Sequence, residues 1–70
     1  MAEFDSGLPS IRHLQSWIQD QRQVELKLLT NDRLIGTLVW QDPHCLCLRD
    51  GQGEQTLIWR QTLAYIKPQS

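Results

Sequence analysis

Two cysteines and two histidines are the residues of this 70-residue chain most suited to metal binding or nucleophilic chemistry. Cys45 and Cys47 are one residue apart, and His44 directly precedes them. A zinc site needs four ligands, and the only further soft donor is His13, so the spacing argues against a metal. No serine or cysteine lies in a recognisable nucleophile motif. These residues predict a protein that is not an enzyme and needs no cofactor or metal.

The elements that would carry these residues are one short helix and five short strands. Residues 1–7 show no periodic pattern and predict a flexible N-terminal tail. Pro9 favours a helix start, and apolar residues at helical spacing extend the helix for about ten residues. From Val24 the apolar period changes to two, so strands are expected at 24–29, 34–41, 45–48, 56–60 and 63–67. In the third of these, alternation predicts that both cysteines pack on the inner face of a small barrel.

Gly36 is an unusual residue for the middle of an apolar strand. The alternation predicts that Leu34, Leu38 and Trp40 share its face. Glycine weakens a strand, since it loses more backbone entropy and packs no side chain. Five strands of this length are too few for a two-layer sandwich, so one sheet must bend onto itself. Glycine is the usual residue at such a bend, because backbones crowd there.

Length and charge limit what the domain can be. Seventy residues form one domain that buries only about 60% of its unfolded surface, and the two cysteines, with one residue between them, close no useful loop. Self-association is therefore the expected source of extra stability. The net charge of −1 means that any nucleic-acid binding depends on local patches. No stretch approaches a membrane span or a signal peptide, and reduced thiols predict a cytoplasmic location.

The order of elements, with Gly36 six residues before Asp42, resembles the Sm fold and, within it, the bacterial RNA chaperone family Hfq. VELKLLTNDRLIGTLVWQD, residues 24–42, is similar to the first Sm motif, and IWRQTLAYIKP, residues 58–68, is similar to the second. The openings GLPSIRHLQ, KLLTNDRLIG, WQDP and AYIKP are most similar to the cyanobacterial branch. The resemblance covers nearly the whole chain and assigns residues 8–70 to one Sm-like domain.

The resemblance implies a mainly β fold with one N-terminal helix and a strongly bent, five-stranded antiparallel sheet in the form of a small open barrel. Such subunits form a homohexameric ring, in which the fourth strand of one pairs with the fifth strand of the next. Pairing would satisfy the open edges of the bent sheet. The strands of that seam would carry Leu57, Trp59, Tyr65 and Ile66.

An RNA site for uridine-rich ends is implied around the pore, on the helix-bearing face. Its positions correspond to Ser10, Asp42, His44, Arg60 and Gln61. His44 occupies the position of a base-stacking aromatic residue, although it also fits a solvated loop residue. Arg60 keeps the charge of the family's pore lysine, with an ion pair to an acid of a neighbour, such as Asp42, as the alternative. Gln61 replaces a histidine and Pro43 a glutamine, so weakened RNA contacts are expected.

The opposite face binds adenosine-rich RNA in the family. Its positions correspond to Lys27, Asn31, Asp32, Arg33 and Tyr65. Lys27 replaces a stacking tyrosine, and Asp32 places an anion where relatives have an apolar residue, which argues against A-rich binding in the usual manner. The outer rim, where relatives carry several arginines, reads Ile-Gln-Asp-Gln at residues 18–21. Weak annealing activity is therefore expected.

Two functions are consistent with this pattern. The first is a homohexameric RNA-binding ring in post-transcriptional regulation, with weakened contacts to U-rich RNA. The alternative is a protein-docking ring with little RNA binding. The resemblance to cyanobacterial relatives implies a link of such a ring to type IV pilus-dependent motility through a pilus motor ATPase. Neither function involves a small-molecule substrate or a membrane. Trp17, Trp40 and Trp59 favour internal packing or the subunit seam over base stacking.

Overall fold

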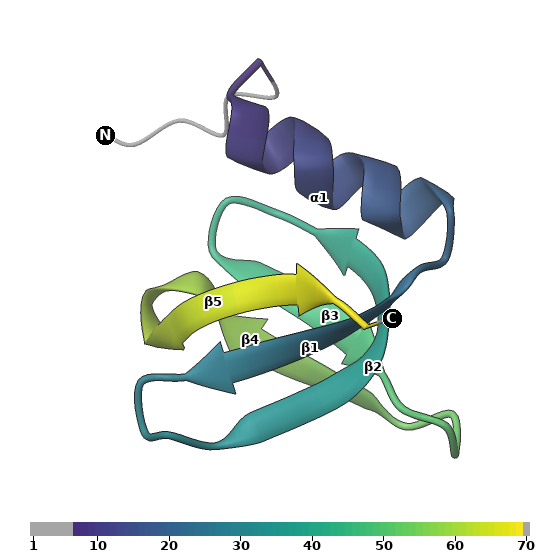
Figure 1. Ribbon diagram of the computed structural model, residues 1–70, viewed down its shortest axis with the longest axis vertical. Coiled ribbons are helices and arrows are strands. Elements are labelled where there is room, and N and C mark those ends of the chain that lie inside the picture. Colours follow the sequence, from purple (N-terminus) through teal and green to yellow (C-terminus); the bar gives the residue numbers. More distant parts are fainter. Residues whose placement is uncertain (1–6, 70) are drawn as a thin grey trace.

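One helix precedes five antiparallel strands in the computed structural model, which describes residues 7–69 (Figure 1). The elements are α1 (Pro9–Gln19), β1 (Gln23–Leu28), β2 (Arg33–Gln41), β3 (Cys45–Arg49), β4 (Gln55–Trp59), the 3₁₀ turn η1 (Arg60–Thr62) and β5 (Leu63–Pro68). The expected fold is confirmed. The flexible tail expected at 1–7 lies outside the described residues, except for Gly7 at its end.

Helix α1 is stabilised by packing more than by its cap. Pro9 occupies the first turn, as predicted, while Leu8 at the N-cap offers no side-chain hydrogen bond. Ile11 and Leu14 are buried, and Trp17 is partly buried against the core. An 11-residue helix is marginal alone in water, so these contacts with the strands must maintain it.

The sheet is open, with the strand order β4-β3-β2-β1-β5. It curls strongly, and α1 lies across one end of the curled strands (Figure 1). Strands β4 and β5 are the two edges, and neither outer edge pairs with another strand among residues 7–69. The main apolar core lies inside the curl and comprises Leu14, Val24, Leu26, Leu38, Leu46, Leu48 and Ile58.

Gly36 allows the backbone of β2 to approach the end of β3 closely. A Cβ atom added there would lie 2.5 Å from the carbonyl oxygen of Arg49 and 3.0 Å from Cγ of Leu48. The first of these contacts is with main chain, which cannot move aside as a flexible side chain can. The expected crowding of backbones at this glycine is confirmed.

A β-bulge between Leu38 and Trp40 reverses the alternation of β2. Leu38 pairs with Leu48 of the core, whereas Trp40 pairs with Cys47. Because a bulge adds one residue to one strand, the residues after it exchange faces. The expectation that Trp40 shares the face of Leu38 was therefore wrong: Leu38 is buried and Trp40 is 39% exposed.

The two cysteines are buried, but not on the face that was expected. Leu46 and Leu48 belong to the main core, so Cys45 and Cys47, which alternate with them, lie on the opposite face of β3. Burial raises the pKa of both thiols. Cys45 pairs across the sheet with Trp59, which is 51% exposed. Trp40 and Trp59 are thus not buried by packing within the chain, and their place in a seam between subunits stays a prediction.

Residues 7–69, the part of the chain that the structure describes, contain neither a metal-binding cluster nor a membrane-spanning helix. No cluster of three or more histidine, cysteine, aspartate or glutamate side chains in this range could hold a metal ion. No helix in the same range is both long and apolar enough to cross a membrane.

Candidate functional site

The loop between β2 and β3 is organised by the carboxylate of Asp42. Its Oδ1 accepts hydrogen bonds from the backbone N–H groups of His44, at 2.8 Å, and Cys45, at 2.7 Å. The N–H of Asp42 donates in turn to the carbonyl of Cys45 at 2.9 Å. These bonds to the ionised carboxylate lower the pKa of Asp42. Asp42 therefore acts as a cap for this loop and fixes the backbone that carries His44.

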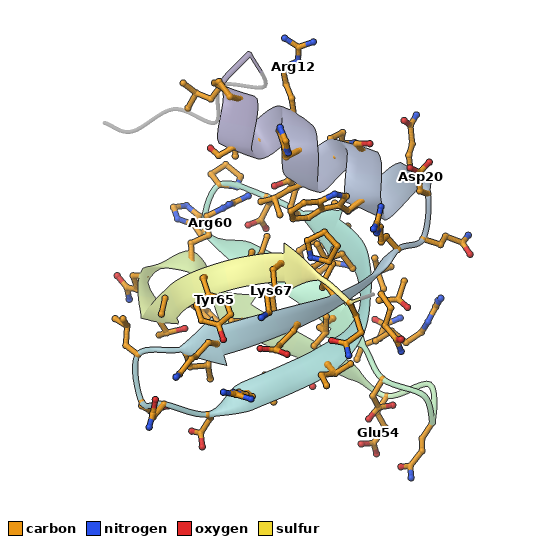
Figure 2. The ribbon with its side chains drawn as sticks, viewed as in Figure 1. Arg12, Asp20, Glu54, Arg60, Tyr65 and Lys67 are labelled. Atoms are coloured by element: carbon orange, nitrogen blue, oxygen red, sulfur yellow. The ribbon has the colours of Figure 1, made fainter. Side chains whose placement is uncertain are left out.

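Arg60 joins this loop from the other end of the chain. It was expected to end a strand, but it begins the 3₁₀ turn η1, directly after β4. Its backbone N–H donates to the carbonyl of His44 at 2.9 Å, and its Nε donates to the carbonyl of Asp42 at 2.9 Å. Arg60, from the second Sm motif, thus contacts the loop of Asp42, which belongs to the first. In Figure 2, Arg60 lies between α1 and the strands.

The guanidinium of Arg60 is partly buried and keeps its charge. Burial lowers the pKa of the group, and the nearby Asp42 carboxylate opposes that shift. An arginine remains protonated at neutral pH after such a shift. Within the chain, Nε of Arg60 donates to the main-chain oxygen of Asp42, and the alternative of an ion pair to an acid of a neighbouring subunit stays a prediction.

Gln61 and Ser10, the other two residues predicted for this site, are both exposed. Gln61 is exposed and follows Arg60 within η1. Ser10 is exposed in the first turn of α1 and lines a groove between α1 and β5, together with Leu63 and Ile66. The structure therefore brings Asp42, His44 and Arg60 into contact, while Ser10 lines the groove between α1 and β5, which none of these three residues lines.

Gln41 was missed as a site residue by the sequence analysis. Its Oε1 accepts a hydrogen bond from Nη2 of Arg60 at 2.5 Å. Its Nε2 donates to Oε1 of Gln15 at 3.0 Å and to the carbonyl of Ile11 at 3.4 Å. Simple alternation placed Gln41 away from the face of Leu38. The bulge reverses the direction of the side chain, and no residue type in the sequence predicts the bulge.

On the outer face of the sheet, cationic side chains surround a tyrosine. Lys27 pairs across the sheet with Arg33 on one side and Tyr65 on the other, so the predicted residues are neighbours. The hydroxyl of Tyr65 donates to Oε2 of Glu25 at 3.0 Å. Nζ of Lys67 lies 5.7 Å from the centre of the tyrosine ring. Figure 2 shows Tyr65 and Lys67 together on β5.

Glu25 and Lys67 were not predicted as members of this outer cluster. Glu25 is only 9% exposed, and its bond to Tyr65 raises the pKa of the phenol. The alternation of β1 places Glu25 and Lys27 on one face, which was the available signal. The partner on β5 could not be read from β1 alone, because it depends on the register of the two strands.

Asn31 and Asp32 form the turn that joins β1 to β2. Asn31 adopts a positive φ of 78°, which asparagine tolerates better than most residues. Oδ2 of Asp32 accepts a hydrogen bond from the hydroxyl of Thr30 at 2.7 Å. Asp32 therefore has a structural role in the turn, beside the outer cluster.

Comparison with known proteins identifies the family. A family model described as "Hfq related" matches residues 8–68 of the chain. The chain belongs to the Hfq-related family. A crystal structure of an Hfq protein from Anabaena is 48% identical, covers 90% of this chain and all of its own, and superimposes with a TM-score of 0.82. The similarity supports the expected likeness to cyanobacterial Hfq proteins.

A more distant structure supports the fold alone. A crystal structure described as the pleiotropic translational regulator Hfq is 21% identical and has a TM-score of 0.78. It covers 83% of this chain and 95% of its own. No match was found among curated protein sequences. Family and fold together confirm the resemblance inferred from the two Sm motifs.

Proposed function

We propose that this Hfq-family protein is a homohexameric ring that binds U-rich RNA ends in post-transcriptional regulation. The supporting observation is the contact of Arg60 with the Asp42–His44 loop, because it joins a cation and an exposed imidazole in one fixed unit. Guanidinium groups bind phosphate, and aromatic rings stack on unpaired bases. In a ring, each subunit would contribute one such unit to a shared pore.

The two open edges of the sheet support the ring. An unpaired strand edge presents N–H and C=O groups that favour pairing with another strand. On β4, Leu57 and Trp59 are about half exposed, at 50% and 51%. Pairing of β4 with β5 of the next subunit would satisfy both edges and cover these side chains. Native mass spectrometry should give six times the 8.2 kDa mass of one chain; a stable single chain would contradict the ring.

Weak and salt-sensitive RNA binding is expected from the same residues. The imidazole of His44 offers a smaller surface for stacking than the phenyl ring it replaces. Pro43 and Gln61 lack the groups that relatives use at these positions. Since the chain carries a net charge of −1, long-range attraction of RNA is small and the local cations must supply most of the affinity.

The proposal is tested by titrating a short U-rich RNA at low salt. Arg60→Ala should weaken binding by at least about tenfold, because it removes a charge-assisted phosphate contact from every subunit. Arg49→Ala is the matched control: it removes the same charge from an exposed residue at the opposite end of β3. Equal affinities of both variants and the unmodified ring would overturn the proposal.

A protein-docking ring is the second candidate. It is favoured by Trp40, which the bulge turns away from the core and leaves 39% exposed. The link to type IV pilus motility through a pilus motor ATPase belongs to this candidate and rests on likeness to cyanobacterial relatives alone. A pull-down with the purified ATPase tests this candidate. The docking function would be favoured over RNA binding if the ring binds no U-rich RNA but captures the ATPase, and if capture is lost on changing Pro43 and His44 or the rim at residues 18–21.

A further inference from the structure

Gln41 connects three parts of the molecule through one side chain. It ends β2, and its amide contacts both helix α1 and the guanidinium of Arg60. The bulge between Leu38 and Trp40 makes this possible, because it directs Gln41 to the side of the sheet that α1 covers. The side chain is half-buried, so water competes less for its bonds than at the surface.

The donors and acceptors around this amide permit one orientation. Arginine has no acceptor, so the amide oxygen must face the guanidinium. On the helix side the carbonyl of Ile11 can only accept, so the amide nitrogen must face the helix, where it also donates to Oε1 of Gln15. A flipped amide would lose the bonds to the guanidinium and to the carbonyl of Ile11.

We infer that Gln41 is a positioning residue, which fixes the guanidinium of Arg60 against helix α1 in the orientation that receives RNA. The RNA part of this inference rests on the proposed function. Nη2 of Arg60 is held by Gln41, and Nε is held by the carbonyl of Asp42. Two bonds to one planar group restrict its rotation, so less freedom is lost when a phosphate binds.

The first test follows the guanidinium in the protein without RNA. Side-chain NMR of Arg60 should show hindered rotation of the Nη groups in the unmodified ring. Gln41→Met has a similar length but no amide, so rotation should become fast. Gln41→Glu keeps the acceptor and should keep rotation hindered. Fast rotation in the unmodified ring, or hindered rotation in Gln41→Met, would overturn the inference.

The second test asks whether Gln41 acts through Arg60. Gln41→Met should weaken binding of a U-rich oligonucleotide about fivefold to tenfold, a loss in the range of one ordinary hydrogen bond, because the lost bond acts on RNA only through Arg60. In an Arg60→Ala background the same change should cost nothing further, since the group it positions is absent. A purely structural role would cost the same in both backgrounds, and that result would overturn the inference.

Controls separate this inference from the function on which it rests. Gln52→Met makes the same substitution at an exposed turn and should alter neither RNA binding nor the NMR signals. Native mass checks that every variant still assembles. If the unmodified ring binds no U-rich RNA, the proposed function fails, while the NMR measurement still decides whether Gln41 fixes Arg60.

Discussion

Two regions of the molecule hold cations in different surroundings. One is the helix-covered site of Asp42, His44 and Arg60, and the other is the outer cluster of Lys27, Arg33, Tyr65 and Lys67. Two of the hydrogen bonds of Arg60 go to neutral oxygens, the carbonyl of Asp42 and the amide of Gln41, while the nearby Asp42 carboxylate raises the pKa of the guanidinium against the effect of burial. On the outer face a carboxylate, Glu25, lies beneath Tyr65 and pairs across the sheet with Lys67. Neutral partners orient a cation and leave its charge available, whereas an adjacent anion offsets part of it. Under the proposed function, we therefore expect phosphate to bind better at the Arg60 site, where the bonds that orient the cation go to neutral oxygens.

The two regions also differ in what fixes them. The Asp42 loop is held by bonds to its main-chain groups: the N–H of His44 donates to the Asp42 carboxylate, and the carbonyl of His44 accepts from the N–H of Arg60. In the outer cluster, strand register brings Lys27, Arg33 and Tyr65 together, and one side-chain hydrogen bond orients the tyrosine. Backbone placement costs less freedom on binding than the ordering of long side chains. The following experiments test this difference.

The bend at Gly36 underlies both regions, and its loss should have the largest effect. Gly36→Val would place a Cβ 2.5 Å from the carbonyl oxygen of Arg49. Backbone must then shift, at a cost of about 3 kcal/mol or more, so the folded ring should be lost together with both sites. Native mass and circular dichroism measure this. An intact hexamer with normal melting would contradict the close approach of the two backbones.

Gly51 provides the matched control for this substitution. It lies in the turn between β3 and β4, and a Cβ there would meet no atom within 4 Å. Gly51→Ala should therefore assemble and melt as the unmodified protein does. A loss of assembly in this variant would show that the ring responds to any glycine change and not to crowding at the bend.

Substitution of His44 should distinguish RNA binding on the helix side from RNA binding on the outer face. His44→Phe enlarges the ring available for stacking and His44→Ala removes it, so U-rich RNA should bind tighter to the first and weaker to the second. A change of about fivefold in each direction is expected, toward the lower end of the effect of one stacked base. Binding of A-rich RNA should not change. Equal effects on both RNAs would contradict a separate helix-side site.

The cap formed by Asp42 should appear in the pH dependence of stability. Its pKa is lowered in the folded chain from an ordinary value of 3.8. The stabilisation is therefore complete above that value, and it is lost as the pH falls through the lower pKa of the folded state. Thermal melts in acid should show this loss in the unmodified protein and not in Asp42→Asn.

Asp20→Asn is the control for charge, because it removes one carboxylate at the end of α1. This variant should keep the acid dependence of the unmodified protein. If Asp42→Asn also keeps it, the carboxylate does not stabilise the loop and the contrast between the two regions loses its structural basis.

Much of the fold could be predicted because it depends on local signals. Pro9 marked the helix start, the change of apolar period marked β1, and Gly36 marked the bend. Each signal is contained within a few neighbouring residues. The motifs also predicted that Asp42 and Arg60 belong to one site, which the contact between them supports.

The supporting residues could not be predicted in the same way. Gln41 faces the helix because of a bulge, and alternation read from the sequence assumes an unbroken strand. Glu25 meets Tyr65 because of the register between β1 and β5, which lie far apart in the sequence. Both residues depend on how strands pair, and pairing is a property of the folded sheet.

The smallest expected effect is a shift in the titration of Tyr65, the only tyrosine of the chain. Its hydrogen bond to Glu25 raises the pKa of the phenol above the ordinary value of 10.0. Ultraviolet titration should therefore place the midpoint above that value in the folded ring. Glu25→Gln should move it back, because the glutamine carries no charge to oppose the phenolate. Glu54→Gln, at the far turn in Figure 2, is the charge-matched control.

The direction of this pKa shift also tests whether the hydrogen bond between Tyr65 and Glu25 orients the tyrosine ring. A raised pKa means that the bond stabilises the fold fully below the ordinary value and is lost as the pH rises through the higher one. A midpoint at or below 10.0 in a ring that is still folded would show that Tyr65 does not hold Glu25. The carboxylate would then offset the nearby cations without orienting the ring, and the outer face would be a weaker RNA surface still.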